Sequence, residues 1–212
     1  MSEVGVRGEP TGAEEDLGAF RDEARAFLKS HAAPRTRGPG EFTWGQGADR
    51  VGLFHEPSPD EESDAVARSR EWRRLRFDAG FGWITGPMEY GGRALPDTFE
   101  RAYGELERGY DTPSQRLVVG PEVMAPALVA HASPEQKSRW LPGMYRGDLI
   151  ACLLFSEPEA GSDLAGVTTS AARTDGSPGV GSGPPAHWEV SGQKVWTSGA
   201  HYADLGLLLA RT

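Results

Sequence analysis

Apolar residues recur every three or four positions along the first two-thirds of the chain. Between residues 14 and 33 this spacing predicts a helix with one apolar stripe, formed by Leu17, Phe20, Ala24, Phe27 and Leu28. The segment Thr11-Gly-Ala-Glu14 has the form of a capping box for that helix. The same reasoning predicts four more helices, over about 61–79, 97–110, 121–131 and 133–146.

Polar residues mark where these helices begin. Asp97, with Glu100 three residues later, is expected to cap the third helix, and Ser133, with Gln136, the fifth. The segment 121–131 is apolar on most sides, which predicts a buried helix. Residues 34–60 are rich in glycine and proline and are expected to form a long connecting loop.

After Asp148 the period changes from three or four residues to two. Strands are expected over 149–155, 167–173 and 205–210, with a Gly/Pro/Ser loop over 175–186. Trp188–Val190 and Lys194–Thr197 flank a Ser-Gly turn and predict a β-hairpin. We therefore expect an α+β fold with a disordered N-terminus (1–13), an all-α domain (14–148) and an antiparallel β domain (149–212).

The predicted β domain is incomplete. Four or five strands that end on an apolar strand would leave a hydrophobic edge unprotected, which natural domains avoid. The missing part is expected to come from a longer chain or from a partner subunit.

Composition narrows the classes of function. The net charge of −9 argues against nucleic acid as a partner. The one basic cluster, within 68–76, is interleaved with apolar residues and is interpreted as a solvated helix face. A single cysteine, Cys152, excludes an intrachain disulfide, and five scattered histidines make a zinc site improbable. Without a signal peptide or an apolar run of about 20 residues, a soluble, cytoplasmic protein with no membrane partner is expected.

Candidate chemistry lies where the first strand ends. At Ser156 the apolar run enters the turn E-P-E-A-G, which closes on Ser162. Such a strand exit presents hydroxyls and free N–H groups to a ligand, although an ordinary turn would have the same sequence. A second stretch, Gly192–Ala200 (G-Q-K-V-W-T-S-G-A), follows about 40 residues later. Neither a nucleotide-binding glycine fingerprint nor a G-x-S-x-G elbow is present, and Ser191-x-x-Lys194 lies in a predicted hairpin rather than at a helix start.

Both stretches resemble the two flavin-contacting segments of the acyl-CoA dehydrogenase family. Three further segments resemble that family in the correct order, and the match covers most of 14–212: Glu89-Tyr-Gly-Gly92, Pro134-Glu-Gln-Lys137 and Leu207–Thr212. The resemblance implies an acyl-CoA dehydrogenase-like α+β fold and FAD as the cofactor.

The resemblance also assigns residues. It implies that the flavin is contacted by Leu153, Leu154, Phe155, Ser156, Trp196, Thr197 and Ser198, and that Ser162 meets the thioester end of the acyl-CoA. From the residues alone, Trp196 could instead be a core aromatic and Ser156 a turn cap. Glu159 departs from the small residue that is commoner in this turn of the family.

The family's catalytic glutamate belongs to a C-terminal helical domain that these 212 residues lack. Glu157 and Glu189 are carboxylates within the chain, but the resemblance places neither at the substrate's α-carbon. No catalytic residue and no metal ligand is therefore assigned.

The resemblance implies oxidation of an acyl-CoA thioester to the 2,3-enoyl-CoA, with the hydride passing to flavin N5. An electron-transferring flavoprotein is the expected acceptor, and the protein is expected to be a homo- or hetero-oligomer. The N-terminal segments most resemble bacterial members that act on bulky acyl groups. Three alternatives stay open: a flavin-dependent monooxygenase on the same fold, a non-catalytic subunit that needs a partner chain, and an inactive fragment.

Overall fold

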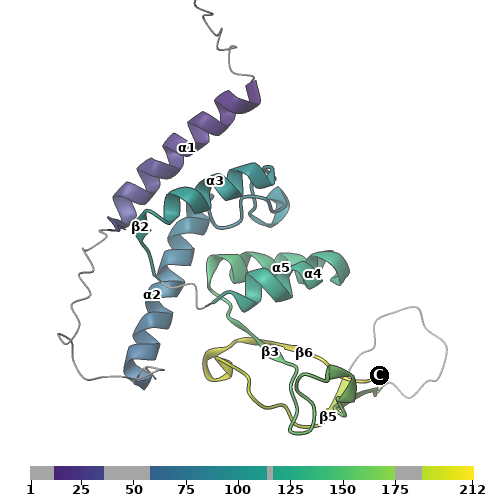
Figure 1. The fold of residues 1–212 in the computed structure, drawn as a ribbon. Coiled ribbons are helices and arrows are strands. Elements are labelled where there is room, and N and C mark those ends of the chain that lie inside the picture. The colour runs from purple at the N-terminus through teal and green to yellow at the C-terminus, as the bar shows by residue number, and fades with distance from the viewer. Residues whose placement is uncertain (1–11, 36–57, 114–116, 175–187) are drawn as a thin grey trace, which may run out of the picture. The chain divides into compact units, whose positions relative to one another are not determined.

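The computed structural model describes residues 12–35, 58–113, 117–174 and 188–212 (Figure 1). These residues belong to two compact units. The first comprises Met1–Arg116 with Tyr145–Gly147, and the second comprises Leu117–Met144 with Asp148–Thr212. The division predicted at residue 148 stays a prediction. The capping box at Thr11 and most of the loops predicted over 34–60 and 175–186 lie outside the described residues.

The described part of the first unit contains three helices that lie wholly within it. These are α1 (Gly12–His31), α2 (Pro59–Asp78) and α3 (Asp97–Glu107), with one 3₁₀ turn, η1, at Met88–Tyr90. Two short strands, β1 (Ala33–Pro34) and β2 (Tyr110–Asp111), pair in antiparallel fashion. The three helices predicted in this region are confirmed.

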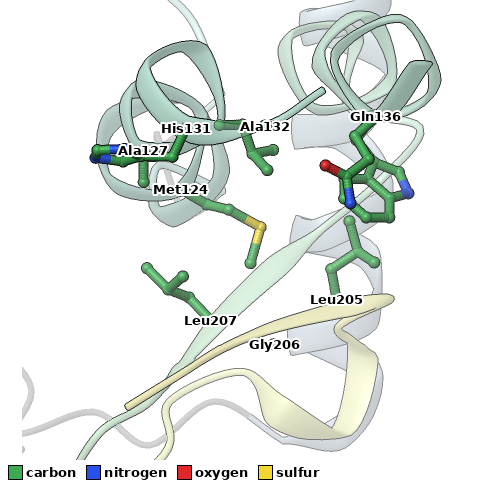
Figure 2. A pocket seen from close by; sticks show the side chains of 10 residues that line it. Met124, Ala127, His131, Ala132, Gln136, Leu205, Gly206 and Leu207 are labelled. Atoms are coloured by element: carbon green, nitrogen blue, oxygen red, sulfur yellow. The ribbon is translucent and has the colours of Figure 1, made fainter. Parts of the chain in front are cut away.

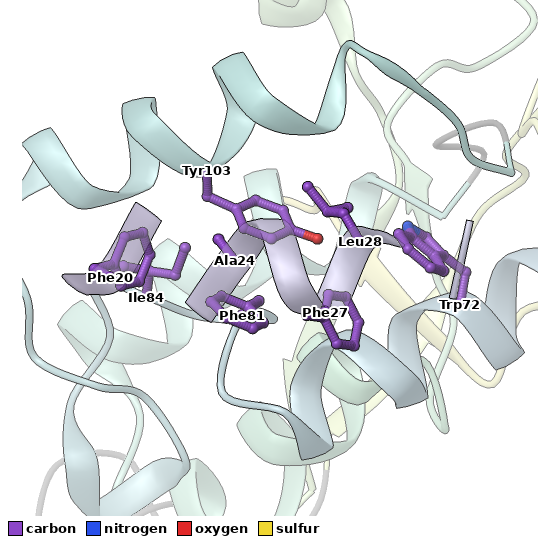
Figure 3. Packing of buried hydrophobic residues seen from close by; sticks show 8 residues of the cluster. All are labelled: Phe20, Ala24, Phe27, Leu28, Trp72, Phe81, Ile84 and Tyr103. Carbon is purple, nitrogen blue, oxygen red and sulfur yellow. The ribbon is translucent and has the colours of Figure 1, made fainter. Parts of the chain in front are cut away.

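The core of this unit is largely aromatic (Figure 3). It is formed by Phe20, Ala24, Phe27, Leu28, Trp72, Phe81, Ile84 and Tyr103. Four of these residues lie on the predicted apolar stripe of α1. The Tyr103 ring stacks on Phe81 with centroids 5.1 Å apart, and burial of each large side chain stabilises the unit by about 1.5–3 kcal/mol.

The prediction that Asp97 and Glu100 cap the third helix is wrong. Asp97 does not cap α3, because Pro96 occupies the N-cap position and no side chain bonds there. Glu100 instead accepts a hydrogen bond from the Thr85 hydroxyl at 2.9 Å. Ser58 and Glu61 form a capping box on α2, which was not predicted from the sequence.

The arginines of α2 are not simply a solvated face. Arg73 is buried, and the Arg76 guanidinium lies over the Tyr103 ring, 4.9 Å from its centroid. The Arg76 guanidinium also lies 3.7 Å from the Glu107 carboxylate. These long side chains face the core because their aliphatic stems pack there while the charged heads find partners.

The second unit begins with helices. One π-helical turn, η2 (Gly120–Met124), leads directly into α4 (Ala125–His131), and α5 (Pro134–Arg146) follows, its last residues belonging to the first unit. The capping box of α5 is confirmed: the Gln136 side chain accepts from Ser133 N–H at 2.9 Å, and Gln136 N–H donates to the Ser133 hydroxyl at 3.3 Å. The helix over 121–131 is only partly buried, since Val123 and Val129 are exposed.

The strands of this unit are short. They are β3 (Ala151–Leu154), β4 (Ser170–Arg173), β5 (Trp188–Ser191) and β6 (Leu205–Leu208), with 3₁₀ turns η3 (Leu164–Gly166) and η4 (Ala200–Tyr202). The α+β class is confirmed. The antiparallel arrangement holds for β4 and β5, which pair with Ser170 opposite Ser191. β3 and β6 pair in parallel instead, from Ala151 opposite Leu205 to Leu154 opposite Leu208.

The hairpin predicted around Ser191-Gly192 is wrong. β5 pairs with β4, and residues 192–197 form no strand. The chain leaves β5 at Gly192, where an added Cβ would lie 2.7 Å from the Cα of Thr169. This close approach requires glycine. The segment that follows then runs beside the exit of β3 rather than back along β5.

Candidate functional site

The two candidate stretches lie side by side at the exit of β3. The backbone N–H of Val195 donates to the carbonyl of Ser156 at 2.9 Å. The Lys194 ammonium donates to the carbonyl of Phe155 at 3.0 Å. Segments about 40 residues apart in the sequence are thus joined through backbone and side-chain hydrogen bonds.

A hollow of about 430 Å³ lies where these stretches meet. It is lined by Val119, Leu153, Phe155, Ser156, Gly161, Leu164, Val195, Trp196 and Ser198. Five of the residues predicted to contact flavin are therefore brought together around one space. Leu154 and Thr197 are not in its lining, and neither is Ser162, although the adjacent Gly161 is.

Trp196 has an unusual backbone. Its φ is +58°, in the left-handed region that a bulky L-residue rarely adopts. Its side chain is 90% exposed, so the alternative of a core aromatic is wrong. A strained conformation that presents a large ring to solvent at the edge of a hollow is typical of a ligand-contacting residue.

Two hydroxyls at this site are without partners among the described residues. The Thr197 hydroxyl is buried and neither donates nor accepts a hydrogen bond among those residues. The Ser156 hydroxyl likewise makes no hydrogen bond within the described part of the chain, so the structure does not support its alternative role as a turn cap. Buried polar groups without partners are rare and call for an explanation.

Glu157 and Lys194, each next in sequence to a residue that lines the hollow, form a buried ion pair. Their side chains are 4% and 9% exposed, and the ammonium lies 2.8 Å from the carboxylate. The carboxylate also accepts from Thr168 N–H at 2.7 Å, the Thr168 hydroxyl at 2.8 Å and Thr169 N–H at 2.9 Å. The hydrogen bond from Lys194, with those from the two threonines, lowers the pKa of Glu157 far below its usual range.

Lys194 is a residue of the site that sequence reasoning missed. A signal for it was present, because each of the two candidate stretches contains one residue of a possible ion pair, Glu157 in the first and Lys194 in the second. Glu157 is held as a structural carboxylate with four donors, and Glu189 is exposed on β5. Within the described residues, no group of three or more histidine, cysteine or carboxylate side chains could hold a metal ion.

Comparison with known proteins identifies the family. The family model "Acyl-CoA dehydrogenase, N-terminal domain" matches residues 49–148, and "Acyl-CoA dehydrogenase, middle domain" matches residues 152–212. The chain belongs to the acyl-CoA dehydrogenase family. The second match contains both candidate stretches of this acyl-CoA dehydrogenase chain.

Individual relatives support the same assignment. Acyl-CoA dehydrogenase IpdE1 of Mycobacterium tuberculosis (strain ATCC 25618 / H37Rv) is 34% identical over 198 residues, which cover 93% of this chain and 45% of the relative. The ChsE4-ChsE5 complex from Mycobacterium tuberculosis matches with 26% identity and a TM-score of 0.60, over 98% of this chain and 44% of that chain. The structure named "Tcur3481-Tcur3483 steroid ACAD" matches with 27% identity and a TM-score of 0.57, over 99% and 45%. The chain thus spans less than half the length of these relatives.

The residues at the hollow fit a flavin, the cofactor that the family implies. An exposed indole offers a stacking surface, and Leu153 and Phe155 offer an apolar wall. The Ser156 and Ser198 hydroxyls in the lining of the hollow are polar groups that a heterocycle edge could satisfy. The assignment of each residue to FAD stays a prediction.

A second hollow in the same unit has a different character (Figure 2). Its volume is about 370 Å³, and its mostly apolar lining comes from the end of η2, from α4 and the residue after it, from α5 and from β6: Met124, Ala127, Leu128, His131, Ala132, Gln136, Trp140, Leu205, Gly206 and Leu207. None of the predicted site residues lies in it.

Among the described residues, no helix has the length and apolarity that a membrane span requires.

Proposed function

We propose that this chain forms part of an FAD-dependent dehydrogenase that oxidises an acyl-CoA thioester between its α- and β-carbons. The observation that supports it is the convergence of Phe155 and Ser156 with Val195, Trp196 and Ser198 around one hollow, with Trp196 exposed at its edge. When bound there, FAD would supply a hydride acceptor at N5.

The chain's own residues would bind, orient and exclude water. Leu153 and Phe155 would form an apolar wall that keeps the reacting atoms dry, while the hydroxyls of Ser156 and Ser198 would offer hydrogen bonds to the ring edge. Leu154 and Thr197 stay candidate flavin contacts outside the lining of the hollow. Ser162 stays the candidate contact to the thioester end of the substrate, and it follows Gly161 at the margin of the hollow.

The base that removes the α-proton is proposed to lie outside these residues. Glu157 is unsuited to that role, because four donors hold its carboxylate and lower its proton affinity. Glu189 lies on the exposed strand β5, and it is not part of the lining of the hollow.

A subunit that shares its site with a partner chain is a second candidate role. It is favoured by the match to the ChsE4-ChsE5 complex, in which two different chains assemble. We propose a second acyl-CoA dehydrogenase-like chain as the partner, an electron-transferring flavoprotein as the acceptor, and a bulky acyl-CoA as the substrate, since one matching structure is named a steroid ACAD. A cytoplasmic location stays a prediction.

Flavin content is the deciding measurement. The chain should be affinity-purified from the cells that make it, so that any partner chain stays attached, and its flavin measured by absorbance and mass spectrometry. We expect stoichiometric FAD and bleaching of its visible absorbance by an acyl-CoA under anaerobic conditions. Absence of flavin from the wild-type preparation would overturn the proposal. FAD that bleaches only with reduced nicotinamide, and then reacts with oxygen, would support the monooxygenase instead.

A further inference from the structure

The Phe155–Ser156 peptide has an unusual environment. Its carbonyl oxygen accepts a hydrogen bond from the Lys194 ammonium at 3.0 Å, while both residues line the hollow. The Ser156 N–H, on the other side of this peptide, donates to no group among the described residues. One side of the peptide is therefore bonded to a buried cation, and the other is available to a ligand.

Lys194 is itself fixed by Glu157. The Lys194 side chain is 9% exposed, and its ammonium lies 2.8 Å from a carboxylate that three further donors hold in place. A charged donor on a carbonyl polarises the peptide and strengthens its N–H as a donor, and low local polarity enlarges this effect.

We propose that Lys194 and Glu157 are a positioning pair for the ligand in the hollow, which acts by orienting and polarising the Phe155–Ser156 peptide. The proposal rests on the proposed flavin site and deepens it. Lys194 is not part of the lining of the hollow, so it acts through Phe155 and Ser156. The backbone N–H of the next residue, Val195, donates to the carbonyl of Ser156, so this bond and that from Lys194 to Phe155 together hold the second stretch in register.

The pair can be tested with three variants whose charges differ. Lys194→Met leaves an unpaired negative charge, Glu157→Gln leaves an unpaired positive charge, and the double variant is neutral, as the wild-type pair is. Because flavin reduction adds negative charge, the two single variants should shift the midpoint potential of the bound flavin in opposite directions: lower for Lys194→Met and higher for Glu157→Gln. A loss of packing alone would not shift the two midpoint potentials in opposite directions.

The double variant separates positioning from folding. Replacing both partners of a buried ion pair is far better tolerated than removing one. We expect it to unfold near the wild-type midpoint and to keep a near wild-type flavin potential. Its FAD affinity should be about tenfold weaker, because the bond to Phe155 O is lost. If single variants do not fold, this double variant alone decides the test.

Glu107→Gln in the first unit is the matched control. Glu107 accepts from Trp72 Nε1 at 3.0 Å and pairs with Arg76, so the substitution removes a comparable charge that is not part of the hollow. It should change the unfolding midpoint without changing FAD affinity or potential. Wild-type FAD affinity in a folded double variant, or equal potentials in both single variants, would overturn the positioning role. Absence of flavin from the wild type would overturn the proposed function itself.

Discussion

The backbone N–H of Val195 donates to the carbonyl of Ser156 at 2.9 Å, and this bond joins two stretches that are far apart in the chain. Both of the residues that it connects line the hollow. Because both stretches are irregular, this bond and the Lys194–Glu157 pair set their register in place of a strand ladder.

Replacing Trp196 should separate ligand binding from stability. Trp196→Ala removes a 90% exposed side chain and should leave the unfolding midpoint nearly unchanged, while lowering flavin retention by about tenfold through loss of a stacking surface. Trp196→Gly should unfold at the same or a higher temperature, because the left-handed conformation costs a non-glycine residue about 1–2 kcal/mol. Unchanged FAD occupancy in both Trp196→Ala and Ser156→Ala would contradict the site assignment.

Gly192→Ala should destabilise the second unit strongly. The new Cβ would lie 2.2 Å from the Thr169 hydroxyl and 2.7 Å from its Cα, and the backbone atom cannot move aside without distorting β4. A loss of about 3 kcal/mol is expected from overpacking and backbone strain. Gly104→Ala is the matched control: nothing lies within 4 Å of the Cβ that alanine would add inside α3, and helix propensity should raise stability by about 0.5–1 kcal/mol. Urea titration of both variants measures the difference, and equal midpoints would contradict the packing described.

Phe81→Ala should be among the costliest substitutions in the first unit. Phe81 is 2% exposed and its ring meets Phe20, Phe27 and Tyr103. Truncation to alanine should cost about 3–5 kcal/mol, because the surrounding rings cannot fill the space. Met88→Ala, at a side chain that is 74% exposed, should change stability by less than about 0.5 kcal/mol. Chemical denaturation followed by tryptophan fluorescence distinguishes them.

Tyr145 should make stability fall at alkaline pH. Its ring stacks on Trp83 with centroids 3.9 Å apart, and burial, aided by the Glu100 carboxylate, raises the pKa of Tyr145 to about 12. The native state thus holds the phenol proton more tightly than the unfolded state. The contribution of protonated Tyr145 to the free energy of unfolding is therefore complete below about pH 10 and is lost as the pH rises to about 12. Tyr145→Phe keeps the stack and should show a shallower fall over this range.

The measurement is the free energy of unfolding of both proteins at several alkaline pH values. Tyr103, whose pKa burial also raises, is present in both and cancels in the comparison. Parallel pH profiles for wild type and Tyr145→Phe would show that the stacked ring titrates normally.

The sequence by itself determined the helices, the α+β fold class and the two candidate stretches. The period of the apolar residues fixes α1 and its core-facing stripe, and local chemistry fixes the α5 capping box, because both depend only on residues within a turn or two. The stretches at Ser156 and Trp196 were recognisable from residue types in order.

The tertiary structure decided which strands pair and how the site is joined. Local alternation predicted a hairpin at Ser191-Gly192, yet β5 pairs with β4 and β3 pairs in parallel with β6. Pairing depends on contacts between distant residues, which periodicity does not encode. The exposed left-handed Trp196 and the buried Lys194–Glu157 pair arise in the same way: a lysine and a glutamate 37 positions apart become an ion pair only when the chain brings them 2.8 Å from one another.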